Sequence, residues 1–172
     1  MIKEKGIFQM KTLIIYYSQT KKTATVAETL ALELGADSIE IVDNKPRSGF
    51  KNRLTSSFDA VREIKTDITP MRVDVSDYDI VYFGTPVWAG KPTPAILTII
   101  DRCDLRAKDV VLFATMNSSG GAASVERMEE KVKLRGARVI ETFTLKTKGK
   151  DMEQLMNETE TIIEILDLNM YR

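Results

Sequence analysis

Residues 12–23 read TLIIYYSQTKKT and contain the sharpest change of character in the chain. The first half is β-branched and aromatic, and so short an apolar run, bounded by turn residues, is typical of a strand buried on both faces. The second half is rich in hydroxyl groups and lysines. A helical pattern follows at once, because apolar residues recur at spacings of three and four from Val26 to Leu34. We therefore expect a buried parallel strand that passes directly into a helix.

The polar half of this segment, residues 18–23, would lie at the N-terminus of that helix. Unpaired backbone N–H groups and the positive end of the helix dipole suit a phosphate group there. The hydroxyl groups of Ser18, Thr20 and Thr23 would add donors, and Lys21 and Lys22 would add positive charge. The alternative is an ordinary strand–helix turn in which serine and threonine serve as helix caps.

The alternation of strand and helix continues along the chain. The expected strands are residues 12–17, 37–42, 79–84, 109–115 and 139–146, and the expected helices are residues 23–34, 58–64, 94–100, 122–135 and 151–168. This pattern, without a repeat or a long linker, predicts an α/β fold: a single-domain, three-layer α/β/α sandwich around a five-stranded parallel sheet of order 2-1-3-4-5. Residues 1–10 carry charge without a period and are expected to be an N-terminal extension of a domain spanning residues 11–172.

Composition excludes several kinds of site and partner. Lys plus Arg and Asp plus Glu both number 25, so no net charge attracts the chain to nucleic acid or to a membrane surface. The chain has no histidine, and its single cysteine, Cys103, rules out an internal disulfide and a multi-cysteine metal site. Asp101 and Asp104 are expected to raise the pKa of Cys103 and keep it unreactive. Without a signal-peptide pattern or a membrane-length apolar span, a cytoplasmic location is expected.

Ligands of such sheets bind at the carboxyl ends of the strands, where the strand order reverses. The loop after strand 79–84 places Trp88 there, and an indole offers a flat surface for stacking on an aromatic ring system. The nearby Gly90 would let the backbone approach a ligand closely. Residues 117–121, which read NSSGG, suit a backbone wrapped against a planar polar ligand. The alternatives are that Trp88 only caps the sheet and that 117–121 is a plain turn.

A phosphate cradle, an aromatic platform and a polar, glycine-rich rim together indicate a phosphorylated aromatic cofactor, of which FMN is the most economical choice. The chain also resembles the flavodoxin family. It is most similar to short flavodoxin-like proteins whose second loop reads Gly-Thr-Pro-Val-Trp-Ala-Gly, the sequence of residues 84–90 here. The resemblance covers residues 11–168.

The resemblance implies that residues 18–23 bind the FMN phosphate, that 85–90 flank the isoalloxazine with Trp88 stacked on it, and that 117–121 contact its pyrimidine edge. The implied cofactor-binding residues are Ser18, Gln19, Thr20, Lys21, Lys22, Thr23, Thr85, Pro86, Val87, Trp88, Ala89, Gly90, Asn117, Ser118, Ser119, Gly120 and Gly121. No catalytic residue and no metal ligand are expected, because a flavin carries the redox chemistry itself.

Three departures from the family pattern affect this prediction. The usual phosphate loop has a glycine where Lys21 stands, and lysine tolerates a left-handed backbone poorly, so the loop is expected to close differently or to compensate with charge. A second aromatic partner, often a tyrosine after strand four, is missing. Carrier flavodoxins are also commonly acidic, whereas this chain is neutral.

Other nucleotide-binding classes fit less well. The chain has no Gly-x-x-x-x-Gly-Lys-Ser/Thr run and no Gly-x-Gly-x-x-Gly opening its first helix, which argues against a P-loop and a dinucleotide-binding domain. A phosphoacceptor receiver domain would need an acidic pair near strand 12–17 and an aspartate ending strand 79–84.

Three functions follow from this interpretation. The first is an FMN-binding electron-transfer protein that serves redox partner proteins. The second is an FMN-dependent NAD(P)H oxidoreductase that reduces a quinone or another small acceptor, with Arg47, Phe50, Lys51 and Arg53 roofing its pocket. The third is a flavodoxin-fold module without flavin. The C-terminal helix covers the sheet and would permit a monomer or a homodimer, and neither nucleic acid nor membrane is expected as a partner.

Overall fold

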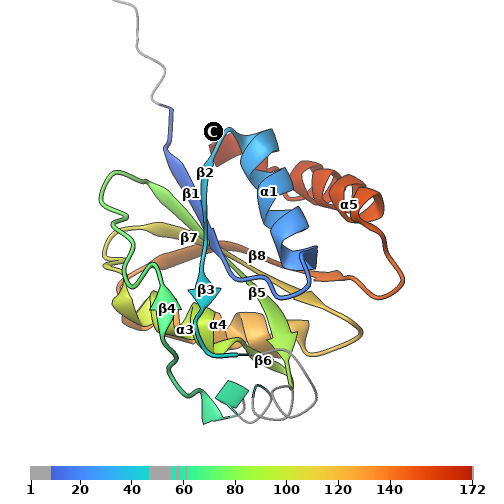
Figure 1. Cartoon of the computed structure of the whole chain (residues 1–172). Coiled ribbons are helices and arrows are strands. Elements are labelled where there is room, and N and C mark those ends of the chain that lie inside the picture. The colour runs from blue at the N-terminus through green and yellow to red at the C-terminus, as the bar shows by residue number, and fades with distance from the viewer. Residues whose placement is uncertain (1–8, 47–55, 57–58, 61, 172) are drawn as a thin grey trace, which may run out of the picture.

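The central sheet has the predicted order. The computed structural model describes residues 9–46, 56, 59–60 and 62–171. Its five main strands are parallel and are ordered β2-β1-β5-β7-β8, which is 2-1-3-4-5 when these strands alone are counted (Figure 1). They are β1 (Thr12–Tyr16), β2 (Asp37–Glu40), β5 (Ile80–Trp88), β7 (Asp109–Met116) and β8 (Arg138–Lys146).

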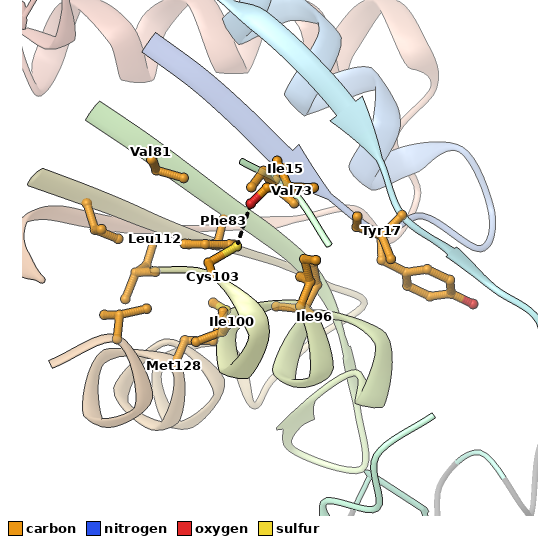
Figure 2. Close-up of a cluster of buried hydrophobic side chains, with 14 of the residues drawn as sticks. Ile15, Tyr17, Val73, Val81, Phe83, Ile96, Ile100, Cys103, Leu112 and Met128 are labelled. Carbon is orange, nitrogen blue, oxygen red and sulfur yellow. Dashed lines mark hydrogen bonds between the residues drawn. The ribbon is translucent and has the colours of Figure 1, made fainter. Parts of the chain in front are cut away.

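Helices cover both faces of this sheet, which completes the three layers. On one face lie α1 (Lys22–Leu34) and α5 (Met152–Ile165), followed by the 3-10 turn η1 (Leu168–Tyr171). On the other lie α3 (Pro94–Arg102) and α4 (Gly121–Leu134). Figure 2 shows the core beneath α3 and α4, where Ile96, Ile100 and Met128 pack toward strand residues Val81, Phe83 and Leu112.

Two short antiparallel pairs extend this plan. β3 (Val42–Asp43) pairs with β4 (Ile68–Thr69), and β6 (Lys91–Pro92) folds back on the end of β5. The predicted strand 37–42 is therefore interrupted at Ile41, whose N–H donates to the Tyr16 carbonyl at 2.7 Å. The predicted strand 79–84 was too short, since β5 continues through Trp88 and the expected loop is largely a β-hairpin.

Parts of the sequence-based prediction lie outside the described residues. They include residues 1–8 and, within the predicted helix 58–64, Phe58 and Val61. Within the described ranges, no helix is both long enough and apolar enough to cross a bilayer.

Three aromatic residues and one glycine form a row across the sheet on the α1/α5 face. Tyr16, Gly84, Phe113 and Phe143 are register neighbours on β1, β5, β7 and β8. The rings of Phe113 and Phe143 stack with centroids 5.3 Å apart and planes 5° apart. A Cβ added to Gly84 would lie 2.1 Å from Cζ of Phe113, so this glycine leaves the room that the ring occupies.

Cys103 is buried, which agrees with the prediction that it is unreactive. The cause of its raised pKa, however, is not the two neighbouring aspartates. Asp101 lies within ion-pair distance of two lysines and Asp104 pairs with Arg106, so neither aspartate presents an unpaired charge to the thiol. Burial raises the pKa of Cys103 to about 11, while the charge of Arg135 acts in the opposite direction. The thiol donates weakly to the Val73 carbonyl at 3.9 Å (Figure 2).

The hydroxyl group of Ser124 on α4 is fully buried and has no hydrogen-bond partner among the described residues. A buried, unsatisfied hydroxyl costs stability, and alanine is the better helix former. We expect Ser124→Ala to raise the free energy of unfolding by about 1 kcal/mol, measured by urea denaturation. Ser118→Ala, at an exposed position, is the matched control and should leave the urea midpoint unchanged. A urea midpoint of Ser124→Ala below that of the wild type would contradict the view that this hydroxyl group destabilises the fold.

Candidate functional site

One cavity of about 460 Å³ lies at the carboxyl edge of the sheet, the edge at which the parallel strands end. The described residues that line it come from segments far apart in the sequence. They are Gln19, Thr20, Lys22 and Thr23 at the start of α1, Ser56, then Pro86, Val87, Trp88 and Ala89 at the end of β5, Thr115, Met116 and Asn117 at the end of β7, and Thr147 after β8. The three loops singled out in the sequence thus meet at one place.

The turn that opens α1 keeps the left-handed conformation, although a lysine occupies it. Lys21 has φ 67° and ψ −6° and is the N-cap of the helix. Of the two outcomes expected for Lys21, a different closure of the loop is therefore not the one seen at this residue. The hydroxyl oxygen of Ser18 accepts a hydrogen bond from the Ala24 N–H at 3.1 Å, which fixes the turn from inside. Neither Ser18 nor Lys21 lines the cavity.

Left-handed backbone is unfavourable for a residue with a Cβ. We expect Lys21→Gly to stabilise the chain by about 1 kcal/mol in thermal or urea unfolding, because glycine adopts this conformation without steric cost. Lys21→Ala is the matched control, since it removes the same charge and keeps the Cβ. Equal stabilities of the two variants would show that the left-handed turn carries no cost.

Next to this turn, Tyr16 and Glu40 form a polar cluster outside the cavity. The Tyr16 hydroxyl donates to Glu28 at 3.2 Å, and the Nζ of Lys21 lies 3.7 Å from Oε1 of Glu40. Burial, followed by the charges of Glu28 and Glu40, raises the pKa of Tyr16 well above its usual range. The tyrosine therefore remains a neutral donor.

The hydroxyl groups of Thr23 and Thr115 lie 2.8 Å apart at the cavity wall, and both residues are buried. The pair joins the first turn of α1 to the end of β7. The Nζ of Lys22 makes a second link, because it donates to the carbonyl oxygens of Thr147 at 2.7 Å and Lys150 at 3.2 Å. The helix start is thus attached to two strand ends.

The β5–β6 hairpin presents Trp88 to the cavity. Ala89 and Gly90, both with positive φ (49° and 75°), form its turn. The half-buried Trp88 meets the buried Tyr17 ring edge to face, with centroids 5.6 Å apart and planes at 88°. Tyr17 packs in the core and therefore orients the indole.

Thr85 holds the base of this hairpin and does not line the cavity. It is fully buried, and its hydroxyl accepts from the Thr93 N–H at 3.0 Å and lies 3.1 Å from the Thr93 hydroxyl. Gly90 is likewise absent from the cavity wall. Thr85 and Gly90 therefore shape the hairpin that carries Trp88.

Within residues 117–121, only Asn117 lines the cavity. Ser118 and Ser119 are exposed beside it. Gly120 has φ 89°, and a Cβ there would lie 2.9 Å from both Cα of Gly90 and Cγ1 of Val87. This glycine lets the loop pack against the hairpin, while Gly121 begins α4 and donates its N–H to the Met116 sulfur at 3.2 Å.

The predicted site did not include Ser56, Thr115, Met116 and Thr147. For Thr147 a signal was present, because it is the first residue after the strand 139–146 and so belongs to the same edge of the sheet. The roofing residues Arg47, Phe50, Lys51 and Arg53 lie outside the described residues. Among those that are described, no cluster of three or more acidic or cysteine side chains could hold a metal ion.

The topology, the edge at which the cavity lies and the loops that line it define a doubly wound α/β protein with a cavity at its switch point. A family model for flavodoxin matches residues 11–162, and the chain belongs to this family. No curated protein sequence matches it.

Solved structures share the fold. A protein from Bacteroides eggerthii DSM 20697 is 23% identical with a TM-score of 0.74, over 92% of this chain and 99% of that one. A flavoprotein from Lactobacillus acidophilus NCFM, solved in complex with FMN, is 26% identical with a TM-score of 0.66, over 80% and 94%. Flavodoxin 2 from Bacillus cereus is 19% identical with a TM-score of 0.54, over 90% and 99%.

Proposed function

We propose that this chain binds FMN in the cavity at the carboxyl edge and acts as an electron-transfer flavoprotein. The observation that carries the proposal is that the start of α1, the Trp88 hairpin and the end of β7 share one cavity. Membership of the flavodoxin family and the FMN complex of the Lactobacillus acidophilus relative support it.

The residues present fit this cofactor. The cavity volume lies within the range of small-molecule sites, and its described wall combines an indole with hydroxyl, amide and ammonium groups. The first turn of α1 with Gln19 and Thr20 would hold the phosphate, since helix N-termini bind anions. Trp88 would face the ring system and Asn117 its polar edge.

Bound FMN would supply the redox chemistry, so the protein needs no acid–base group of its own. The described cavity wall carries no carboxylate, tyrosine or thiol, and its one ionisable side chain is that of Lys22. The chain instead binds and orients. Pro86 and Val87 would provide an apolar wall beside the cofactor, and Tyr17 keeps the Trp88 ring in place.

An NAD(P)H-dependent reductase is the second candidate, favoured by one observation. Ser56, which lies between β3 and β4 in the sequence, lines the cavity and would contact a substrate bound above a flavin. The carrier is preferred because it requires only an exposed cofactor edge and a docking surface for a redox partner protein. A cytoplasmic location is part of the proposal and agrees with the single, buried cysteine.

The visible absorption spectrum under anaerobic conditions separates these candidates. The protein is loaded with FMN, freed of excess flavin, and mixed with NADPH or NADH. We expect a protein-bound flavin spectrum that stays oxidised with pyridine nucleotide and bleaches with dithionite. Rapid bleaching by NADPH or NADH would assign the reductase instead, and failure to retain any FMN would reject both.

A further inference from the structure

The described segments that supply most of the cavity wall are rich in lysine. Residues 18–25, 85–92, 115–123 and 146–151 contain six lysines and one acidic residue, Asp151. The lysines are Lys21, Lys22, Lys91, Lys146, Lys148 and Lys150. Acidic and basic residues are equal in number over the whole chain, so the balancing negative charge belongs to other parts of the sequence. These four segments therefore carry an excess of positive charge that the net charge of the chain does not reveal.

Some charged groups of these segments already have partners within the chain. The Nζ of Lys21 lies 3.7 Å from Oε1 of Glu40, and Lys150 pairs with Glu158. Asp151 caps α5, where its carboxylate accepts a backbone N–H of that helix at 2.8 Å. Neighbouring carboxylates thus offset two of the six lysines.

Lys146 and Lys148 have no such compensation. Both are exposed, and among the residues that the structure describes neither has a carboxylate at ion-pair distance. Lys22 belongs to the cavity wall and Lys91 is half-buried, but Lys146 and Lys148 lie outside the wall, on either side of Thr147, which is part of it. Their charges are therefore placed where a body that covers the cavity mouth would meet them.

The backbone that carries these two lysines is held in place. The Thr147 N–H donates to the Met116 carbonyl at 2.8 Å, and the Lys150 N–H donates to the Thr147 carbonyl at 3.2 Å. The Nζ of Lys22 ties the same turn, between β8 and α5, to the start of α1 (Figure 1). A partner would therefore find both charged residues on backbone already fixed beside the cavity, which lowers the entropy cost of docking.

We propose that Lys146 and Lys148 form a docking surface at the cavity mouth for a redox partner protein whose own surface is acidic. The inference rests on the proposed function and adds the chemistry of the partner to it. Opposite charges steer two proteins together and orient them, and exposed charges act mainly on the association rate. A flavin in the cavity would lie next to this contact, because Thr147 joins the two lysines to the cavity wall.

The test uses two haem proteins of opposite charge as acceptors, an acidic b-type cytochrome and the basic cytochrome c. The FMN-loaded protein is photoreduced anaerobically and mixed with each cytochrome in a stopped-flow instrument. Each ferric haem takes one electron and becomes ferrous, so one reduced flavin serves two haems and returns to its oxidised form. We expect the rate with the acidic cytochrome to fall as salt is added and the rate with cytochrome c to rise.

The double variant Lys146→Gln/Lys148→Gln should lower the rate with the acidic cytochrome about three- to tenfold at low ionic strength. It should change the dissociation constant of FMN less than about twofold, because neither lysine lines the cavity. Arg72→Gln/Lys133→Gln is the matched control, since it removes two exposed positive charges outside the cavity wall and should change the rate less than about twofold. Equal losses in the two double variants would show that only net charge matters and would overturn the inference. So would a wild type that reacts faster with cytochrome c at low salt.

A measurement without flavin separates this inference from the proposed function. Calorimetry should detect binding of the acidic cytochrome to the wild-type apoprotein and weaker binding to Lys146→Gln/Lys148→Gln, whose circular dichroism spectrum verifies its fold. If the wild type retains no FMN but binds the acidic cytochrome through these lysines, the proposed function fails and the docking surface stands. If it retains FMN and the variant loses affinity only for the small anion NADPH, the docking surface is wrong and the cofactor site stands.

Discussion

Gly84→Ala is expected to destabilise the fold by about 3 kcal/mol, at the upper end for overpacking of a core. The added Cβ would lie 2.1 Å from Cζ of Phe113, a ring that is fully buried and stacked on Phe143. The ring cannot simply rotate away, because Phe143 and the α1/α5 layer surround it. Urea denaturation followed by circular dichroism measures the effect.

A second substitution separates this steric cause from a general intolerance of alanine. Phe113→Leu shortens the side chain that the new Cβ meets, and in the Gly84→Ala background it should recover part of the lost stability. The two changes should therefore be non-additive in a double-mutant cycle. If Gly84→Ala unfolds at the wild-type midpoint, the packing explanation for the first glycine of the 84–90 motif is wrong.

Trp88→Ala is expected to weaken FMN binding by about 2 kcal/mol, close to 30-fold, because aromatic stacking contributes on this scale. Trp88 is the only aromatic residue in the described cavity wall. Flavin fluorescence on titration gives the dissociation constant, and Trp88→Phe is the control that retains a ring and most of the affinity. If Trp88→Ala bound FMN with wild-type affinity, the indole would not be part of the binding site.

Most of the fold could be predicted from the sequence because its central strands β1, β5 and β7 are buried on both faces over most of their length. Such strands appear as short apolar runs, and α1 and α5 carry a clear helical period. The end of β5 was missed because Pro86, Gly90 and Pro92 look like turn residues. In the structure β1 ends opposite Gly84, so at Pro86 the strand β5 has no neighbour on the β1 side. A proline, which lacks an N–H donor, is therefore tolerated at this position of β5.

The candidate site could be predicted as a set of loops but not residue by residue. Loop position follows from topology, whereas the role of each side chain depends on distant neighbours. The hydroxyl group of Thr85 accepts a hydrogen bond from the Thr93 N–H, and that of Ser18 accepts one from the α1 backbone. Lys21 and Lys22 differ only because Glu40 and the Thr147 carbonyl lie beside them. No local pattern contains these contacts.

The central claim, that the cavity is an FMN site, is tested most directly by the emission of Trp88, which is the only tryptophan of the chain and lines that cavity. Purified apoprotein is titrated with FMN while tryptophan and flavin fluorescence are both recorded. We predict that both signals are quenched together and saturate at one FMN per chain. Tryptophan emission that stays unquenched, after correction for FMN absorbance, in a protein shown to be folded would contradict the account.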